Sequence, residues 1–317
     1  MLESNGKMMN PEERTYALMA SARIANVPSV VSNTWLGIAI GFFWNSELPI
    51  HFPWYESFRI ITAAILLYFS GNFVNDWMDR GWDAKHRPER ALPRKLFPAN
   101  LYLSLALSLG VVGVAMAWTV SLHSAMAAGV IVCLIMIYTI SHKRTGWAVI
   151  PMGLCRGMLP IMGVLAFCPS IIAVLPVSCG LWCYIMGLSL SARFEAVADP
   201  PRRVAVFAQG LLFAPVAFAA WGNQLLALGW AVTLASALPY LAWTGFSLKF
   251  RRRPIPLLVS SLLAGIPLVD WIVLLPLAVM LAGHDSSGSQ AIAVLCFTLP
   301  PLAFTLARLL QRFAPAT

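Results

Sequence analysis

The sequence predicts an all-α transmembrane bundle of nine to ten spans. Of its 317 residues, 59% are hydrophobic and only 11% are charged, whereas soluble domains carry about 25% charged residues. Apolar stretches of about 20 residues, the length that crosses a bilayer, also recur along the whole chain. We therefore exclude a soluble fold. The formal net charge of +9 is explained by the loops, and nucleic-acid binding is not expected.

The individual spans are predicted from apolar stretches of sufficient length. The ten candidates lie near residues 28–46, 57–75, 100–120, 124–141, 146–167, 171–192, 204–221, 225–246, 255–282 and 290–307. We expect residues 28–312 to form a single transmembrane domain. Residues 1–27 form a polar lead-in without a secretory signal pattern, and residues 11–27 are a candidate interfacial helix.

Basic residues occur in alternate loops. Of the 22 Lys and Arg, 20 precede the first stretch, follow the last, or lie near residues 79–99, 142–145, 193–203 and 247–253. The five intervening loops have none. By the positive-inside rule, both termini and the four basic loops are cytoplasmic, which requires an even number of spans. We expect a multi-pass protein of the cell (inner) membrane.

The most polar segment follows the second span and reads GNFVNDWMDRGWDAKHRPERALPRKL, residues 71–96. If the helix continues through it, Asn75, Asp79 and Asp83 lie on one face, since they are spaced i, i+4, i+8. Two carboxylates in one small volume favour a hard cation such as Mg²⁺, which takes one or two carboxylates together with phosphate oxygens. A solvated loop after a charged helix end is the alternative.

Basic residues come directly after these carboxylates and would hold a polyanion beside the metal. They are Lys85, Arg87, Arg90, Arg94 and Lys95. Asn72 and Asp76 repeat the four-residue spacing one register away, and Asn72 is a candidate substrate-binding residue. The segment therefore predicts a joint site for a metal and a polyanion.

Polar residues at other span ends extend this candidate site. In the first span, Arg23 would reach a phosphate or extend to lipid head groups, and Asn33 would line a cavity or bond to a neighbouring helix. At the end of the fourth span, Tyr138 and Lys143 lie at the level of the acidic segment. Lys143 is a candidate diphosphate contact, although a positive-inside anchor explains it equally well.

Arg156 lies about 15 Å into the fifth span, near the membrane midplane. A charge at that depth costs at least about 2.5–3.5 kcal/mol, so it must face a polar interior. We expect a cavity-lining, substrate-binding role, with a structural ion pair as the alternative. Asp270, in the ninth span, has no functional account from the sequence.

The sixth span ends in a second acidic pair. Glu195 and Asp199 follow Asn75 and Asp79 by 120 residues, which suggests a parallel internal repeat. We treat them as candidate ligands of a metal. Arg193, two residues before Glu195, is a candidate substrate-binding residue.

These residues resemble the UbiA superfamily of intramembrane prenyltransferases. The family motif N-D-x-x-D-x-x-x-D matches Asn75 to Asp83, and the segment P-x-R-P-L-P resembles residues 88–93, with Ala91 in place of a proline. Glu195 and Asp199 stand where the family's second motif usually has aspartates. The segment SARFEA, residues 191–196, is similar to the EboC-like branch.

The resemblance implies a bundle, usually of nine spans, around a central cavity open to the bilayer. It further implies that two acidic motifs bind Mg²⁺ and an isoprenyl diphosphate. By position, Asn75, Asp79 and Asp83 would form the first metal site, Arg90 would contact the diphosphate, and Arg23 and Lys143 are further candidates for that contact. Asp79, Asp83, Arg90 and Lys143 are the expected catalytic residues.

The leading hypothesis is a Mg²⁺-dependent transfer of an isoprenyl group from a polyprenyl diphosphate to a small aromatic or polyol acceptor. Cations would neutralise the leaving diphosphate, and an apolar cavity would keep water from the carbocation. One alternative is a membrane carrier with Arg156 in its pathway. Another is an inactive homologue that binds an isoprenoid lipid. The sequence does not specify the chain length, the acceptor or the oligomeric state.

Overall fold

The structure is a computed structural model, and it describes residues 11–45, 52–193, 202–251, 254–283 and 287–314. Throughout these ranges the regular structure is helical, as predicted. The first six helices are α1 (Pro11–Ser21), α2 (Val27–Trp44), α3 (Trp54–His86), α4 (Ala99–Trp118), α5 (Leu122–Ser141) and α6 (Val149–Val164). The remaining six are α7 (Leu175–Arg193), α8 (Arg202–Leu225), α9 (Trp230–Phe250), α10 (Ile255–Ala264), α11 (Ile266–Ala282) and α12 (Ser287–Leu310). Short 3₁₀ turns, Ile24–Asn26 and Gly146–Ala148, precede α2 and α6.

Ten helical segments in the described ranges are long and apolar enough to cross a membrane. They coincide with the ten predicted stretches, so the chain has the even number that the distribution of basic residues requires. This is one span more than the nine that are usual in the family that the sequence resembles. The helix predicted within residues 11–27 is present as α1, while its interfacial position stays a prediction.

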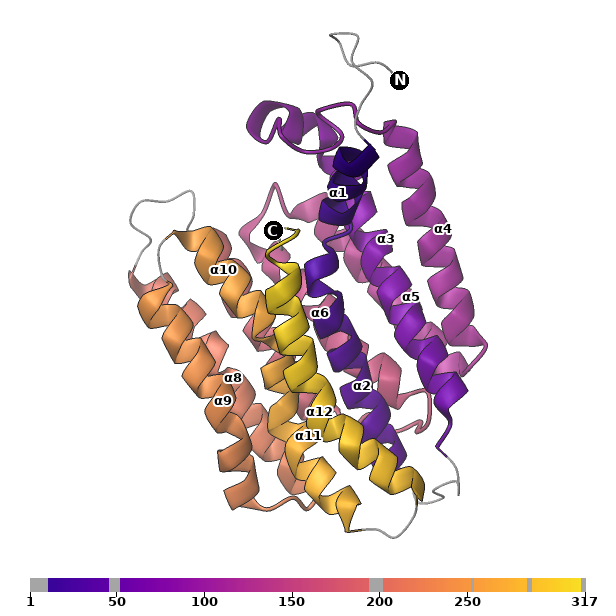
Figure 1. Ribbon diagram of the computed structural model, residues 1–317, viewed down its shortest axis with the longest axis vertical. Coiled ribbons are helices and arrows are strands. Elements are labelled where there is room, and N and C mark those ends of the chain that lie inside the picture. Colours follow the sequence, from indigo (N-terminus) through magenta and orange to yellow (C-terminus); the bar gives the residue numbers. More distant parts are fainter. Residues whose placement is uncertain (1–10, 46–51, 194–201, 252–253, 284–286, 315–317) are drawn as a thin grey trace.

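The core of the bundle lies around α2 and the segment formed by α10 and α11. Of their most apolar windows, 72% and 78% of the residues are buried, compared with 22% for α8. In Figure 1, α3, α4 and α5 lie on one side of α2, and α8, α9 and α10 lie on the other. Because α2 packs against α3, α6, α11 and α12, it joins the two sides.

Small residues let α2 and α6 cross at very short range. A Cβ added at Gly37 would come within 1.9 Å of the Pro160 carbonyl oxygen, and one at Gly163 within 2.4 Å of the Thr34 carbonyl oxygen. In a lipid environment, helix association depends on such close backbone packing. The crossing therefore requires glycine at both positions.

The predicted ninth span is broken near its middle. Helix α10 ends at Ala264 and α11 begins at Ile266, with Gly265 between them. Pro267, near the start of α11, has no N–H to donate, which suits a helix beginning there. Asp270 lies at the first turns of α11 and is fully buried, so the break brings a carboxylate into the core.

Helix α3 is longer than a membrane requires. Its 33 residues correspond to about 50 Å, whereas the hydrocarbon core is about 30 Å thick. The helix continues past Asp83 and ends at His86, which confirms the assumption for the part of the segment that carries Asn75, Asp79 and Asp83. Its last turns, which carry Asp79 and Asp83, therefore exceed the length that crossing this core requires.

We expect Gly37→Ala to destabilise the protein by about 1–3 kcal/mol, because the added methyl group would overlap a backbone carbonyl that cannot move independently. Thermal unfolding in detergent measures the effect. Gly129→Ala in α5 is the matched control, since a Cβ there meets nothing within 4 Å and alanine is the better helix former. Equal melting temperatures for the two variants would contradict the close crossing.

Candidate functional site

The acidic face consists of Asn75, Asp76, Asp79 and Asp83 on the last turns of α3. All four side chains are buried. The spacing predicted that three of them share one side of the helix, and the continuous helix confirms this. Buried carboxylates are stable only when they are paired or bind cations, so the contacts of each one indicate what the site can hold.

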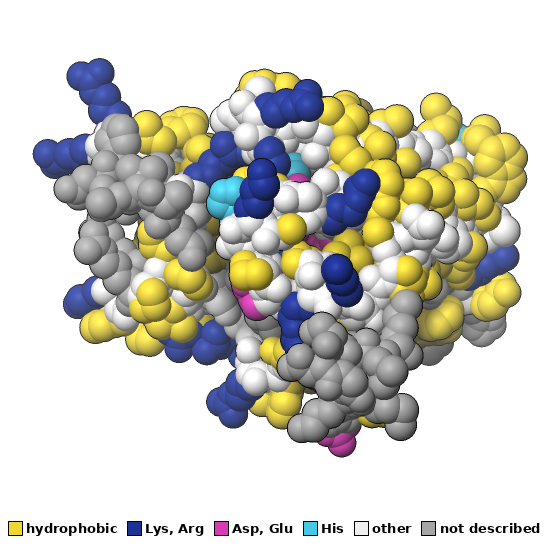
Figure 2. Space-filling view, turned by 90° about the horizontal axis from the view of Figure 1, so that it is seen from above, with side chains coloured by type: hydrophobic (Ala, Val, Ile, Leu, Met, Phe, Trp, Pro, Cys, Tyr) yellow, Lys and Arg dark blue, Asp and Glu magenta, His cyan; other side chains and the backbone are white. Residues whose placement is uncertain are grey.

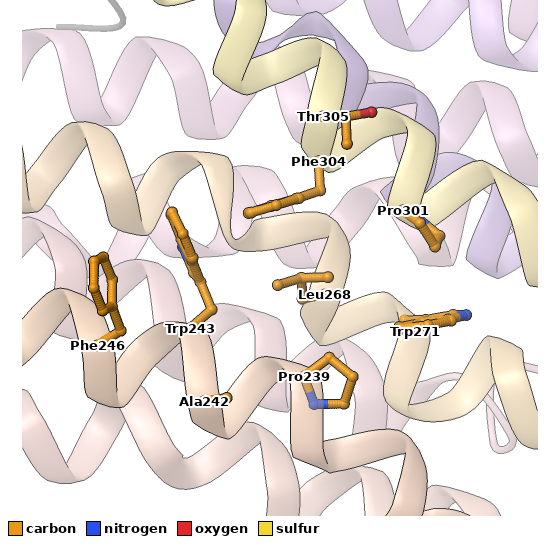
Figure 3. A pocket seen from close by; sticks show the side chains of 9 residues that line it. All are labelled: Pro239, Ala242, Trp243, Phe246, Leu268, Trp271, Pro301, Phe304 and Thr305. Atoms are coloured by element: carbon orange, nitrogen blue, oxygen red, sulfur yellow. The ribbon is translucent and has the colours of Figure 1, made fainter.

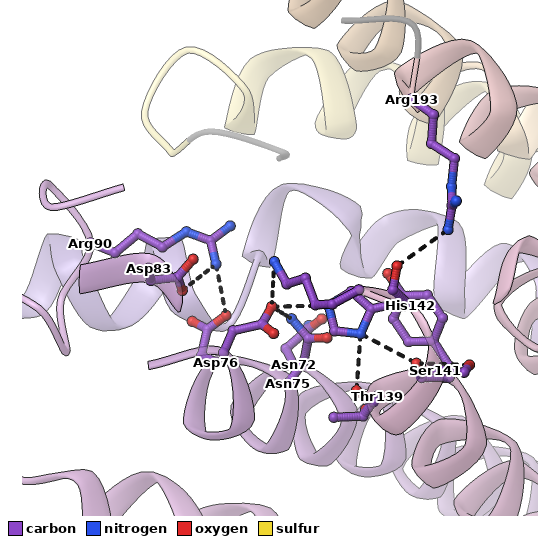
Figure 4. Close-up of polar contacts among 12 residues, drawn as sticks. Asn72, Asn75, Asp76, Asp83, Arg90, Thr139, Ser141, His142 and Arg193 are labelled. Atoms are coloured by element: carbon purple, nitrogen blue, oxygen red, sulfur yellow. Dashed lines mark hydrogen bonds and ion pairs between the residues drawn. The ribbon is translucent and has the colours of Figure 1, made fainter. Parts of the chain in front are cut away.

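Asp83 and Asp76 contact Arg90 (Figure 4), and Asp76 also contacts Arg23, from a distant part of the chain. Arg90 Nη1 donates to Asp83 Oδ2 at 2.9 Å and lies 3.6 Å from Asp76 Oδ1. Arg23 Nη2 approaches the same Asp76 oxygen, also at 3.6 Å. These contacts bring Arg23 and Arg90 to one end of the acidic face, while their role as diphosphate contacts stays a prediction.

Asp79 contacts a histidine and a lysine that directly follow α5. His142 Nε2 lies 3.1 Å and Lys143 Nζ 3.3 Å from Asp79 Oδ2. Asn75 Nδ2 donates to the same oxygen at 3.3 Å. Lys143 Nζ also lies 3.6 Å from the centre of the Trp82 ring, in the geometry of a cation–π contact.

His142 was missed by the sequence analysis, although it is adjacent to Lys143. Its Nδ1 lies 3.0 Å from the Thr139 carbonyl oxygen, and its Nε2 faces Asp79. Both neighbouring oxygens can accept a hydrogen bond, so the two ring nitrogens fix the orientation of the imidazole. The Tyr138 ring stacks on the imidazole with centroids 5.0 Å apart. Tyr138 thus supports the site through His142.

Local structure explains how Arg23 and Arg90 reach the acidic face. Arg23 has a left-handed backbone (φ 49°) at the turn between α1 and the following 3₁₀ turn. Asn72 secures that turn, because its Oδ1 accepts from Arg23 Nη1 at 2.8 Å and its Nδ2 donates to the Ala22 carbonyl at 2.9 Å. The loop that carries Arg90 is anchored by buried Ala91 and Leu96.

Arg193 lies at the end of α7 and contacts the loop after α5. Its Nη2 donates to the Thr145 carbonyl at 3.1 Å and to the His142 carbonyl at 3.4 Å. It therefore contacts the backbone beside the acidic face, without a contact to the carboxylates themselves. The second predicted acidic pair, Glu195 and Asp199, lies outside the described residues.

Deeper in the bundle, Ser32, Asn33, Arg156 and Asp270 form a second polar group, the midplane network. Asn33 Nδ2 donates to both oxygens of Asp270, at 2.9 and 2.8 Å, and Ser32 Oγ donates to Oδ2. Asn33 Oδ1 accepts from Arg156 Nη1 at 3.2 Å. Asn33 therefore bridges Arg156 to Asp270.

The midplane network lies next to the acidic site. The Arg156 guanidinium lies 5.4 Å from the centre of the Tyr68 ring, and Tyr68 OH donates to the Arg23 carbonyl at 3.2 Å. Asn33, Asp270 and Ser32 are fully buried, whereas Arg156 is partly accessible. The position of Arg156 is compatible with a structural role, since the buried carboxylate of Asp270 is nearby. It is also compatible with a substrate-binding role, since the Arg156 side chain is partly accessible.

The acidic face has the atoms that a hard cation prefers. Asn75 Oδ1 and Asp83 Oδ1 are buried and accept no hydrogen bond from the described part of the chain. Buried oxygens of this kind call for a water or an ion. Among the described residues, no three His, Cys, Asp or Glu side chains converge tightly enough to form a complete metal centre. The residues present therefore fit a metal that takes its remaining ligands from a substrate.

Charged side chains gather at this end of the molecule. Figure 2 shows Lys and Arg distributed over the end face, with acidic and His side chains near its centre and hydrophobic side chains around the rim. A phosphate-bearing ligand would meet positive charge on approach and carboxylates at the centre. Such a field favours the capture of an anion.

Comparisons with known proteins give a family and a fold. The model of the UbiA prenyltransferase family matches residues 34–200. A structure of digeranylgeranylglyceryl phosphate synthase in membranes is 14% identical with a TM-score of 0.56, covering 94% of this chain and 98% of that one. The apo structure of a UbiA homologue from Aeropyrum pernix K1 is 13% identical with a TM-score of 0.52, covering 96% and 100%.

A UbiA homologue from Archaeoglobus fulgidus, bound to GPP and Mg²⁺, also matches at 13% identity and a TM-score of 0.47, covering 92% of this chain and 98% of that chain. No curated protein matches this chain. The narrower resemblance of residues 191–196 to the EboC-like branch stays a prediction. Because the family model matches more than half of the chain and the solved relatives have the same helical architecture, the chain belongs to the UbiA prenyltransferase family.

Proposed function

We propose that this protein transfers an isoprenyl group from a polyprenyl diphosphate to a small aromatic or polyol acceptor within the membrane, in a Mg²⁺-dependent reaction. The observation that carries the proposal is the acidic face, where three buried carboxylates meet Arg23, Arg90, His142 and Lys143, which come from the turn after α1, the loop after α3 and the residues after α5. A site that can bind both a metal and a diphosphate needs both charges at one place.

Asn75, Asp79 and Asp83 are the proposed ligands of Mg²⁺, with Glu195 and Asp199 as a second acidic pair. Bound Mg²⁺ would neutralise charge that develops on the diphosphate oxygens. Arg90 and Lys143 each hold a carboxylate of the acidic face in this structure. On substrate binding they would exchange these carboxylates for diphosphate oxygens, so the site stays close to electroneutral in both states.

Arg23 and the end of α7, with Arg193, are proposed to complete the diphosphate site. Asn72 fixes the turn of Arg23, so the guanidinium is positioned before substrate arrives, which lowers the entropic cost of binding. The prenyl chain would extend into the apolar bundle, where water is excluded and the allylic cation is protected. Tyr138 lies at this boundary and offers an aromatic face.

The midplane network is proposed to orient the acceptor. Asn33 takes up one donor of Arg156, and the remaining guanidinium donors face the interior on the accessible side of the residue. A phenol, carboxylate or hydroxyl oxygen of the acceptor would accept from them. Asp270 offsets the charge of Arg156 without occupying those donors, since it bonds to Ser32 and Asn33.

Because basic residues mark the cytoplasmic side of membrane proteins, we propose that the acidic face opens to the cytoplasm. The start of α1, the end of α12 and the ends of α3, α5 and α9 that carry the basic loops lie at this end of the bundle (Figure 1). A cysteine-labelling experiment on intact and opened cells or vesicles distinguishes the two orientations.

We expect Asp83→Asn and Asp79→Asn each to lower the rate of Mg²⁺-dependent diphosphate release by at least about a hundredfold, because each removes a negative charge needed to hold the metal. The assay supplies purified protein with farnesyl or geranylgeranyl diphosphate, with and without Mg²⁺, and a panel of acceptors. Glu89→Gln is the matched control, since Glu89 is an exposed carboxylate beside Arg90.

Two outcomes of this assay would contradict the proposal. If the prenyl diphosphate binds but no diphosphate is released with any acceptor, the protein is an inactive isoprenoid-binding homologue. Flux of an unchanged substrate across reconstituted vesicles would favour a carrier.

We expect Arg156→Met to weaken acceptor binding by about 10- to 100-fold, the loss typical of a hydrogen bond to a charged group. Binding of the prenyl diphosphate should stay within about twofold of the wild type, measured by calorimetry in the absence of acceptor. Arg59→Met at the far end of α3 is the control. An equal loss of diphosphate affinity would place Arg156 in the donor site instead.

A further inference from the structure

Outside the candidate site, α9, α11 and α12 line an open apolar groove of about 530 Å³ at the surface of the bundle (Figure 3). We name it the aromatic groove. Helix α11 contributes Leu268 and Trp271, while α9 and α12 contribute Trp243 and Phe304, whose rings meet edge to face at 4.8 Å. Prolines lie within both flanking helices, and proline bends a helix. The groove is thus a built feature of these three helices.

The lining of the groove restricts the ligand that fits it. Thr305 is the single hydroxyl-bearing side chain among its lining residues, and the others are aromatic or aliphatic. Much of the surface of α9 and α12 is unburied within the bundle, as expected of helices that face lipid. A hydrocarbon chain from the bilayer is therefore the part of a ligand that this groove accommodates.

Two arginines lie over the same indole at one end of the groove. The guanidinium carbon of Arg251 lies 5.2 Å from the centre of the Trp243 ring, and that of Arg308 lies 5.5 Å from it. Arg251 follows α9 and Arg308 belongs to the last turn of α12. Their charged groups are thus at the end of the molecule where the basic residues gather, the level of lipid head groups.

Within the described part of the chain, Arg251 and Arg308 form hydrogen bonds with neutral side chains. Arg251 Nη1 donates to Ser261 Oγ at 2.9 Å, and Arg308 Nη1 donates to Gln311 Oε1 at 3.0 Å. Neither arginine joins an ion pair with a described carboxylate, and exposed Arg312 adds further positive charge nearby. Two like charges on one ring repel, and an anion between them would remove that repulsion.

We propose that this groove binds one anionic phospholipid, whose phosphate lies between Arg251 and Arg308 and whose acyl chain occupies the aromatic groove. Guanidinium groups bind phosphate through paired hydrogen bonds, and both arginines have donors left for it. The complementarity is twofold: an apolar groove for the chain and an uncompensated pair of cations at its polar end. This site is separate from the acidic face and does not depend on prenyl transfer.

The test measures lipid binding to the purified full-length chain by native mass spectrometry, with titration of phosphatidylglycerol or phosphatidylcholine of the same acyl chains. We expect phosphatidylglycerol to bind at least tenfold more tightly than phosphatidylcholine. The double variant Arg251→Gln, Arg308→Gln should lose this preference, and Arg251→Lys, Arg308→Lys should retain part of it. Arg59→Gln, at the opposite end of the molecule, should leave it unchanged.

A second variant tests the acyl chain independently of charge. Thr305→Trp fills the groove from its edge and should weaken phosphatidylglycerol binding at least fivefold, with the melting temperature of the lipid-free protein unchanged. The proposal is overturned if the two lipids bind equally to the wild type or if the double glutamine variant keeps the preference. It is also overturned if Thr305→Trp binds as the wild type does, or if inorganic phosphate competes as well as the lipid.

Discussion

The structure depends on the pairing of buried charge at the end of α3. Three carboxylates that would be unstable alone are compensated by Arg23, Arg90, His142 and Lys143, which come from the N-terminal turn, the loop after α3 and the end of α5. The pairs of Arg23, His142 and Lys143 join segments that are distant in sequence, whereas Arg90 lies seven residues after Asp83. The same electrostatics that stabilise this end of the fold therefore assemble a group of charges suited to a metal and a diphosphate.

This arrangement requires α3 to continue past Asp83 and α2 to approach its neighbours closely. The first condition keeps Asn75, Asp79 and Asp83 on one continuous helix beside Arg90 and Lys143. The second rests on Gly37 and Gly163, where the backbones of α2 and α6 come into contact. Because α2 also carries Asn33, its position links the packing of the bundle to the midplane network.

The interior of the bundle contains two polar layers that differ in how many charged groups they hold. The acidic face holds several full charges near the membrane surface, whereas the midplane network contains one carboxylate and one guanidinium joined by an amide. Tyr68 lies between the layers. A substrate with a charged head and a long apolar chain matches this gradient. The aromatic groove on the lipid-facing side has the same arrangement, because arginines lie at one end and apolar side chains line the rest.

The sequence by itself determined where the apolar spans lie, to nine or ten in number, together with the alternation of basic loops and the acidic face of α3, because hydropathy and helical periodicity are local properties. It also pointed to Arg23, Arg90, Lys143 and Arg156 as charges with partners. Only the tertiary structure decided which partners these are. His142 and Asp270 gave no local signal, since a histidine beside a lysine and a lone aspartate in a span have no periodic pattern. Their roles depend on contacts across 63 and 237 positions of the chain, which packing alone brings together.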